Sequence, residues 1–224
     1  MKETGMMSRS NTTQALLQQL RLDIILGKYE NGEQVRELDL ADKYGTSRAA
    51  VRNALMVLEH EGMVITQANG TKKLRRLTVE DIYDVYDMRS YIENKAIEQI
   101  FSRPNRDFTH LIEILNQLGN AQSGPVEEIL ALDAAFHRES IAMSGNAAIT
   151  QAWDMMDGVT QTIFNLNMTE SQEYKNWYIE TVVERHKQLF VLLMTDETKS
   201  KELFLSHIQD ALQVSVKAME KILK

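Results

Sequence analysis

Three of the five histidines in this sequence, together with one aspartate, fall within apolar patterns of helical spacing. Asp133 and His137 are four residues apart, so both side chains lie on one face of a helix. His186 and His207 lie at comparable distances on either side of a short turn, so their two helices run antiparallel and the imidazoles can face each other. One carboxylate and three imidazoles in the core of a helical bundle would suit Zn²⁺, Ni²⁺ or Mn²⁺.

Each of these residues also has an ordinary structural interpretation. An Asp-x-x-x-His spacing is common on helices, and a histidine on an apolar face is usually a hydrogen-bonded core residue. A buried carboxylate without a partner is costly, and a divalent metal would compensate it. The spacing alone therefore leaves two hypotheses open, a metal site or a set of unrelated core histidines.

Arg89 falls on the inward stripe of a long predicted helix, where a charged side chain needs a partner. Glu93, four residues later, can form an ion pair with it. Alternatively, Arg89 can bind the carboxylate of a small ligand, since guanidinium groups make bidentate contacts with carboxylates. Both interpretations remain open. Trp177 and Tyr178 are further candidates to line a ligand cavity, against the simpler expectation that they fill the core.

A second group of polar residues suits contact with nucleic acid. The segment 37–62 predicts two helices joined by a sharp turn at Gly45, with Ser47 as the N-cap of the second helix. In a helix-turn-helix, the N-terminal residues of the second helix meet base edges in the major groove, where arginine can bond guanine and asparagine can pair with adenine. Three side chains lie there, off the apolar stripe: Arg48, Arg52 and Asn53.

The next segment predicts a β-hairpin behind the second helix. Residues 63–67 are rich in β-branched side chains, and Asn69-Gly70 is a strong signal for a two-residue turn. A hairpin in this position is the wing of a winged helix. Its tip is suited to phosphate or minor-groove contact through Gly70, Lys72, Lys73, Arg75 and Arg76.

The chain divides into three predicted parts. Residues 1–10 are expected to be disordered, and residues 11–77 to form a winged helix-turn-helix of three helices and a hairpin. Residues 78–224 are expected to form an antiparallel bundle of about six helices, which opens with a capping box and contains an irregular polar segment at 167–176. The predicted fold class is therefore mostly α.

Charge is distributed unevenly along the chain. The net charge is −7, but residues 1–77 carry 12 basic and 9 acidic side chains, whereas residues 78–224 carry 13 and 23. A mildly basic part joined to an acidic part suggests a nucleic-acid-binding domain with a separate sensing or assembly domain. No apolar run is long enough to span a membrane and there is no cysteine, so a cytoplasmic protein without disulfides is expected.

The run LADKYGTSRAAVRNALMVLEHEG resembles the winged helix of the GntR family of transcription regulators, and the similarity covers about residues 10–77. The resemblance implies that Arg48, Arg52 and Gly70 occupy DNA-contacting positions. Many members have an arginine where this chain has Leu38, and Arg36 is a candidate to replace it.

The run LALDAAFHRESIAMSGN resembles the D-x-x-F-H and G-N signature of the FadR-type C-terminal ligand-binding domain, FCD. In that family an aspartate and three histidines hold a metal that helps to bind a small carboxylate effector. The resemblance implies the same role for Asp133, His137, His186 and His207, with zinc expected and nickel or manganese as alternatives.

Together these features predict a ligand-responsive transcription regulator, more specifically a repressor, and not an enzyme. It is expected to bind double-stranded DNA as a homodimer at a near-palindromic operator, under the control of a small carboxylate effector. Three alternatives remain: a metal sensor without an organic effector, a metal-dependent hydrolase that carries a winged helix, and a helical domain that only dimerises.

Overall fold

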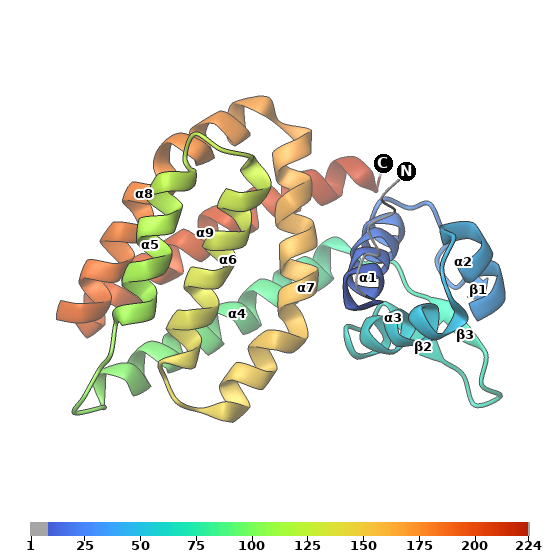
Figure 1. Ribbon diagram of the computed structural model, residues 1–224, viewed down its shortest axis with the longest axis horizontal. Helices are drawn as coiled ribbons and strands as arrows, with labels where there is room; N and C mark the ends of the chain where they lie inside the picture. Colours follow the sequence, from blue (N-terminus) through green and yellow to red (C-terminus); the bar gives the residue numbers. More distant parts are fainter. Residues whose placement is uncertain (1–8, 224) are drawn as a thin grey trace, which may run out of the picture. The chain divides into compact units, whose positions relative to one another are not determined.

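The computed structural model describes residues 9–223, and within them the fold is mostly helical with one small sheet (Figure 1). The expected fold class is confirmed, because three helices and a small sheet are followed by six helices in the described chain. The chain forms two compact units, one up to Thr78 and a second from Val79 to Glu220. The expected disordered segment, 1–10, lies outside the described residues except for its last two, which begin the first helix. Among residues 9–223 no helix combines the length and apolar character needed to cross a membrane.

The N-terminal unit contains a helix-turn-helix and a hairpin. Its elements are α1 (Arg9–Ile25), β1 (Gln34–Val35), α2 (Glu37–Tyr44), α3 (Arg48–His60), β2 (Val64–Thr66) and β3 (Lys72–Leu74). The chain turns between α2 and α3 at Gly45, whose φ of 62° lies in the left-handed region that glycine adopts without steric cost. Ser47 caps α3 as predicted, because its side chain accepts a hydrogen bond from the backbone N–H of Ala50 at 3.2 Å.

The core of this unit lies between α1 and α3, which pack against each other. Six side chains of these two helices are completely buried among the residues whose burial the structure describes: Leu20, Ile24, Val51, Ala54, Leu55 and Leu58. These residues recur at helical spacing, so one face of each helix is buried. The opposite face of α3 stays exposed and carries Arg48, Arg52 and Asn53.

The three strands form an antiparallel sheet in the order β1-β3-β2. β2 and β3 are the predicted hairpin, with Thr66 opposite Lys72 near the turn and Gly70 at a φ of 80°. β1 has no signal in the sequence, because two residues are too few for an alternating pattern. Its pairing with β3 makes it a strand.

The second unit consists of helices alone. They are α4 (Val79–Phe101), α5 (Thr109–Ala121), α6 (Val126–Ala142), α7 (Ala147–Glu170), α8 (Gln172–Thr195) and α9 (Glu197–Ile222). α6 is the central helix, because it packs against α4, α5, α7 and α8. Residues on α6 therefore face several helices at once.

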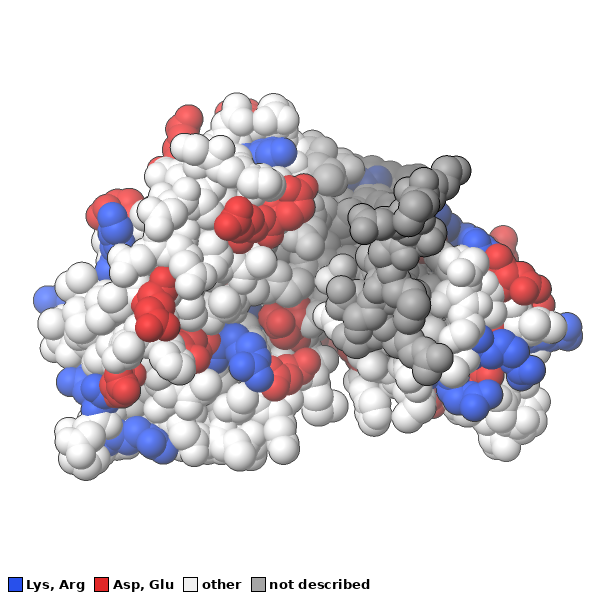
Figure 2. Space-filling view, viewed as in Figure 1, with Lys and Arg blue, Asp and Glu red and all other residues white. Residues whose placement is uncertain are grey.

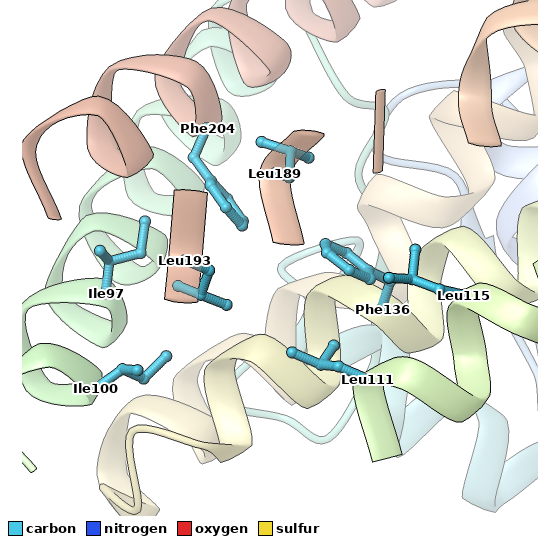
Figure 3. Close-up of a cluster of buried hydrophobic side chains, with 8 residues drawn as sticks. All are labelled: Ile97, Ile100, Leu111, Leu115, Phe136, Leu189, Leu193 and Phe204. Atoms are coloured by element: carbon cyan, nitrogen blue, oxygen red, sulfur yellow. The ribbon is translucent and has the colours of Figure 1, made fainter. Parts of the chain in front are cut away.

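A cluster of buried apolar side chains holds five of these helices together (Figure 3). It consists of Ile97, Ile100, Leu111, Leu115, Phe136, Leu189, Leu193 and Phe204. Phe136 of α6 also lies edge-on to the ring of His186, with centroids 4.8 Å apart. The cluster therefore adjoins the histidines and restricts their side chains.

The segment 167–176, expected to be irregular, is helical apart from one residue. α7 continues to Glu170 and α8 begins at Gln172, with the extended Ser171 between them. Ser171 caps α8 by accepting a hydrogen bond from the backbone N–H of Tyr174 at 3.1 Å. The prediction was wrong because a single capping residue is enough to separate two helices, and polar composition does not distinguish an exposed helix from a loop.

Candidate metal centre and nucleic-acid interface

The structure brings together the four residues that the sequence predicts as metal ligands: Asp133, His137, His186 and His207. Asp133 and His137 come from α6, His186 from α8 and His207 from α9. Each offers one donor atom, and the four atoms lie within 4.8 Å of one another. The closest pairs are Nε2 of His186 with Oδ1 of Asp133, at 3.0 Å, and Nε2 of His137 with Nε2 of His207, at 3.1 Å. Three of the side chains are buried and His207 is partly exposed.

Two features of the sequence produce this arrangement. The four-residue spacing of Asp133 and His137 stacks both on one face of the central helix α6. Asp196 alone separates α8 from α9, and His186 and His207 lie at nearly equal distances from it. Their rings therefore face each other across the helical hairpin, with centroids 5.3 Å apart.

In two of the histidines, Nδ1, the ring nitrogen that faces away from the other three residues, forms a hydrogen bond with another group. Nδ1–H of His186 donates to the backbone carbonyl of Val182 at 2.8 Å, and Nδ1–H of His137 donates to Oε2 of Glu93 at 3.0 Å. A neutral imidazole carries one N–H, so the neutral form of either ring has its lone pair on Nε2, which faces the other members of the set. An imidazole that binds a metal is held in the same way.

Several buried atoms of the set lack a hydrogen-bond partner. They are Oδ1 of Asp133, Nε2 of His186 and Nδ1 of His207. With a neutral His186, the contact between Asp133 and His186 joins a carboxylate oxygen to a ring nitrogen without a proton, and neither atom satisfies the other; with a protonated His186 the same contact is an ion pair. A cation would satisfy such acceptors together, and two ligand atoms of one tetrahedral zinc ion lie roughly 3.3 Å apart. The donor set therefore fits a metal ion of the zinc class.

Burial and neighbouring charges set the protonation of these ligands. In the metal-free chain burial disfavours a charge on Asp133, but the charge of a protonated His186 and a hydrogen bond from its ring outweigh burial and hold the pKa of Asp133 below its ordinary value. Burial lowers the pKa of His207 well below the ordinary range of histidine, and His137 and His186 add to the effect. At neutral pH the set thus presents a carboxylate and an unprotonated His207, the forms that bind metals.

Arg89 and Glu93 of α4 form a buried ion pair beside the set. Nε–H of Arg89 donates to Oε1 of Glu93 at 2.7 Å, while the other carboxylate oxygen holds His137. Burial disfavours the charge on Glu93, but His137 and Arg89 outweigh it and lower the pKa of Glu93. The ion pair between Arg89 and Glu93, one of the two interpretations of Arg89 from the sequence, is present in the structure. The link from Glu93 to His137 has no signal in the sequence, because it joins two helices.

Arg89 also lines a cavity of about 30 Å³ beside the four residues, so its two interpretations are compatible. A water molecule needs about 10–15 Å³, so the cavity has room for about two waters. Its wall includes Trp177 and Tyr178, which were considered for this role, and three residues that were not: Trp153, Asp157 and Arg185. Helix α7, which carries Trp153 and Asp157, has no apolar pattern that singles out these positions.

Two donors in the cavity wall make no hydrogen bond of good geometry. They are Nε1–H of Trp153 and the hydroxyl of Tyr178, which are both buried; Asp133 lies near the hydroxyl and helps to raise its pKa. Burial raises the pKa of Tyr178 well above its ordinary value, so its hydroxyl keeps the proton. The cavity therefore combines cationic, donor and metal-ligand groups in one small space.

The residues predicted to contact DNA belong to the N-terminal unit. On the face drawn in Figure 2, Lys and Arg side chains lie on the right together with acidic ones. The predicted contact residues that are exposed to solvent include Arg36, Arg48, Arg52, Asn53 and Gly70. Ser47 serves as the helix cap. Lys72 differs, because its side chain is only 20% exposed and its ammonium donates to Glu59 of α3 at 2.8 Å. It links the hairpin to α3.

Both units match known families. The FCD domain matches residues 84–210, and the bacterial regulatory proteins of the gntR family match residues 12–71. The gluconate operon transcriptional repressor of Bacillus licheniformis is 26% identical over 205 residues, which cover 90% of this chain and 82% of that protein. The uncharacterized HTH-type transcriptional regulator YdhC of Bacillus subtilis is 25% identical over 193 residues, which cover 85% and 83%.

A solved structure shares the fold. The putative transcriptional regulator GntR from Rhodococcus sp. RHA1 superimposes with a TM-score of 0.61 at 21% sequence identity. The match covers 92% of this chain and 97% of that chain.

Proposed function

We propose a function for a chain that belongs to the GntR family of bacterial regulatory proteins and carries an FCD domain: a small carboxylate, bound beside a divalent metal ion, controls its binding to DNA. The chain is a DNA-binding transcriptional regulator and not an enzyme, because its family and its relatives are regulators. The hydrolase alternative is thereby removed. A relative named as a repressor favours repression as the mode of action.

One observation carries the proposal. Buried, unpartnered acceptors of Asp133 and His186 meet beside a cavity that Arg89 lines. A divalent ion held by Asp133, His137, His186 and His207 would supply positive charge for a carboxylate. Arg89 would add N–H donors to the same carboxylate. The free N–H of Trp153 and O–H of Tyr178 would bind further oxygens of the effector.

Helix α4 provides the route from the effector to the DNA-binding unit. It carries Arg89 and Glu93, and it begins at Val79, a few residues after the last strand of the hairpin. A ligand that draws Arg89 toward the metal changes the contacts of a helix that is covalently continuous with the winged helix. Control requires that the effector bind the DNA-bound and DNA-free states with different affinity.

On DNA, the chain acts as a homodimer at a near-palindromic operator. Each copy inserts α3 into the major groove, with Arg48, Arg52 and Asn53 toward the bases. Arg36 and the backbone at Gly70 lie at the edges of this surface and contact the DNA backbone.

The first experiment is selection of bound genomic fragments by the purified chain, followed by protection mapping. A short palindromic footprint that is lost in Arg48→Ala or Arg52→Ala is the expected result. No preference over random DNA at moderate salt, with and without metal, would overturn the operator proposal.

The second experiment measures bound metal and screens small carboxylates for release of the operator. Release by one carboxylate, only in metal-loaded protein, is expected. Release by metal alone would favour the metal sensor. An effector that acts equally on metal-free protein would remove the metal from the mechanism.

A further inference from the structure

We propose that Glu37 is a positioning residue for base recognition: it holds Arg52 so that the outer end of the guanidinium faces the DNA. The proposal rests on insertion of α3 into the major groove, which is part of the proposed function. Glu37 belongs to α2, and its negative charge is unsuited to binding phosphate.

The Glu37 carboxylate binds Arg52 through two parallel hydrogen bonds. Nε–H of Arg52 donates to Oε1 at 2.9 Å, and Nη2–H donates to Oε2 at 2.8 Å. Nη2 of Arg48 lies 3.8 Å from the same Oε2. One carboxylate from α2 therefore contacts both arginines at the start of α3.

These two bonds involve one edge of the Arg52 guanidinium, and the donors at its outer end are not bound to Glu37. A guanidinium has five N–H donors, of which Nε–H and one N–H of Nη2 are directed at Glu37. The remaining donors on Nη1 and Nη2 form a pair, and such a pair matches O6 and N7 of guanine. The Arg52 side chain is 57% exposed, so DNA can reach this end.

The carboxylate is anchored on a different helix from the arginine. Glu37 is the first residue of α2, where the helix dipole favours a negative side chain. α2 packs against α3 and buries Leu40 and Ala41. The hydrogen bond from Arg52, above all, holds the pKa of Glu37 below its ordinary value, so the carboxylate is charged at neutral pH.

A contribution to folding stability does not by itself explain why the chain has this ion pair. Pairs between exposed side chains contribute little to stability. A carboxylate on the DNA-binding surface repels phosphates and so lowers affinity for every sequence. In return, an Arg52 that is already oriented loses less conformational freedom on binding. Glu37 should therefore raise preference for the operator while lowering affinity for DNA in general.

The test measures the affinity of the full chain and of Glu37→Gln for the selected operator and for random DNA at one salt concentration. Glutamine keeps the shape of the side chain but has one acceptor oxygen and no charge. We expect the ratio of operator to random affinity to fall about tenfold. Random DNA should be bound equally or more tightly, and the melting temperature should not change.

Asp39→Asn is the matched control. Asp39 is exposed two positions further along α2, and within the described residues it has no ion pair with Arg48 or Arg52. Its replacement removes the same charge and should leave the affinity ratio unchanged. An equal fall in the ratio for both variants would attribute the effect to charge alone and overturn the proposal.

A second comparison uses single-base-pair variants of the operator. Glu37→Gln and Arg52→Ala should relax the preference at the same base pair, and the double variant should relax it no further than Arg52→Ala. If Glu37→Gln keeps that preference, or weakens all positions alike and lowers the melting temperature, Glu37 is only a link between helices. Absence of any preferred sequence for the unchanged chain is a different result, which would overturn the proposed function.

Discussion

The carboxylate of Glu93 lies 3.0 Å from Nδ1 of His137, although the two residues are on different helices and 44 positions apart. The contact keeps the proton of His137 on Nδ1 and frees Nε2 for the candidate metal site. Since Glu93 also binds Arg89, one buried carboxylate connects a predicted metal ligand to the residue predicted to bind the effector.

Replacement of Glu93 by glutamine should weaken metal binding about 10–100-fold, because partners of a ligating histidine fix its proton and raise its basicity. Affinity is measured by competition with a chromophoric chelator, and the melting temperature is measured alongside because Arg89 loses its charged partner. Glu98→Gln on the same helix is the control, since Glu98 is exposed and pairs with Lys95. Equal metal affinity in both variants would contradict the assigned role.

His137→Ala should abolish metal binding and the response to the effector, while operator binding in the absence of effector persists. The reason is that His137 is one of the four candidate metal donors, whereas the residues proposed to contact DNA lie in the other unit. Metal per chain is measured by elemental analysis. His110→Ala, at an exposed histidine, should keep both properties. An intact response to the effector in His137→Ala would show that neither His137 nor a metal bound by it is needed for control of DNA binding.

Metal-free protein should lose stability as the pH falls below about 6.5, the ordinary pKa of histidine. Burial lowers the pKa of His207, so in this range the unfolded chain takes up a proton that the folded chain does not. Denaturant midpoints between pH 7.5 and pH 5 measure the slope. His207→Gln should flatten it, whereas His60→Gln on the surface should not. An unchanged slope in His207→Gln would mean that this group does not carry the effect.

Tyr178→Phe should leave the ligand-free protein as stable as before or more stable, by up to about 1–3 kcal/mol, because it removes a buried hydroxyl that makes no hydrogen bond of good geometry. The same change should weaken effector binding, since the hydroxyl lines the cavity. Thermal shifts with and without effector measure both effects. Tyr83→Phe, at an exposed tyrosine, is the control. A loss of stability without effector would show that the hydroxyl already has a structural partner.

The sequence predicts those features that depend on spacing within one or two helices. The four-residue interval from Asp133 to His137 and the similar distances of His186 and His207 from Asp196 account for the two pairs, and packing of α6 against α8 brings the pairs together. The turn at Gly45 and the cap at Ser47 are equally local, and both are present.

Features that depend on packing between distant helices are not predictable in this way. The contact of Glu93 with His137 requires the rotation of α4 against α6, which no pattern within α4 specifies. Lys72 was expected on the DNA-facing tip of the hairpin, but its ammonium donates to Glu59 of α3, a contact between elements that no pattern within the hairpin specifies. Trp153 joins the cavity wall through the position of α7.

Ser171 alone separates α7 from α8, and both helices line the cavity. An inserted residue that joined either helix would rotate the wall residues beyond it by about 100° and carry them away from the candidate metal ligands. A residue inserted at this junction therefore preserves the cavity wall only if it joins neither helix. Adaptation to another metabolite, or redesign of the chain as a biosensor, has to proceed by exchange of wall side chains such as Trp153.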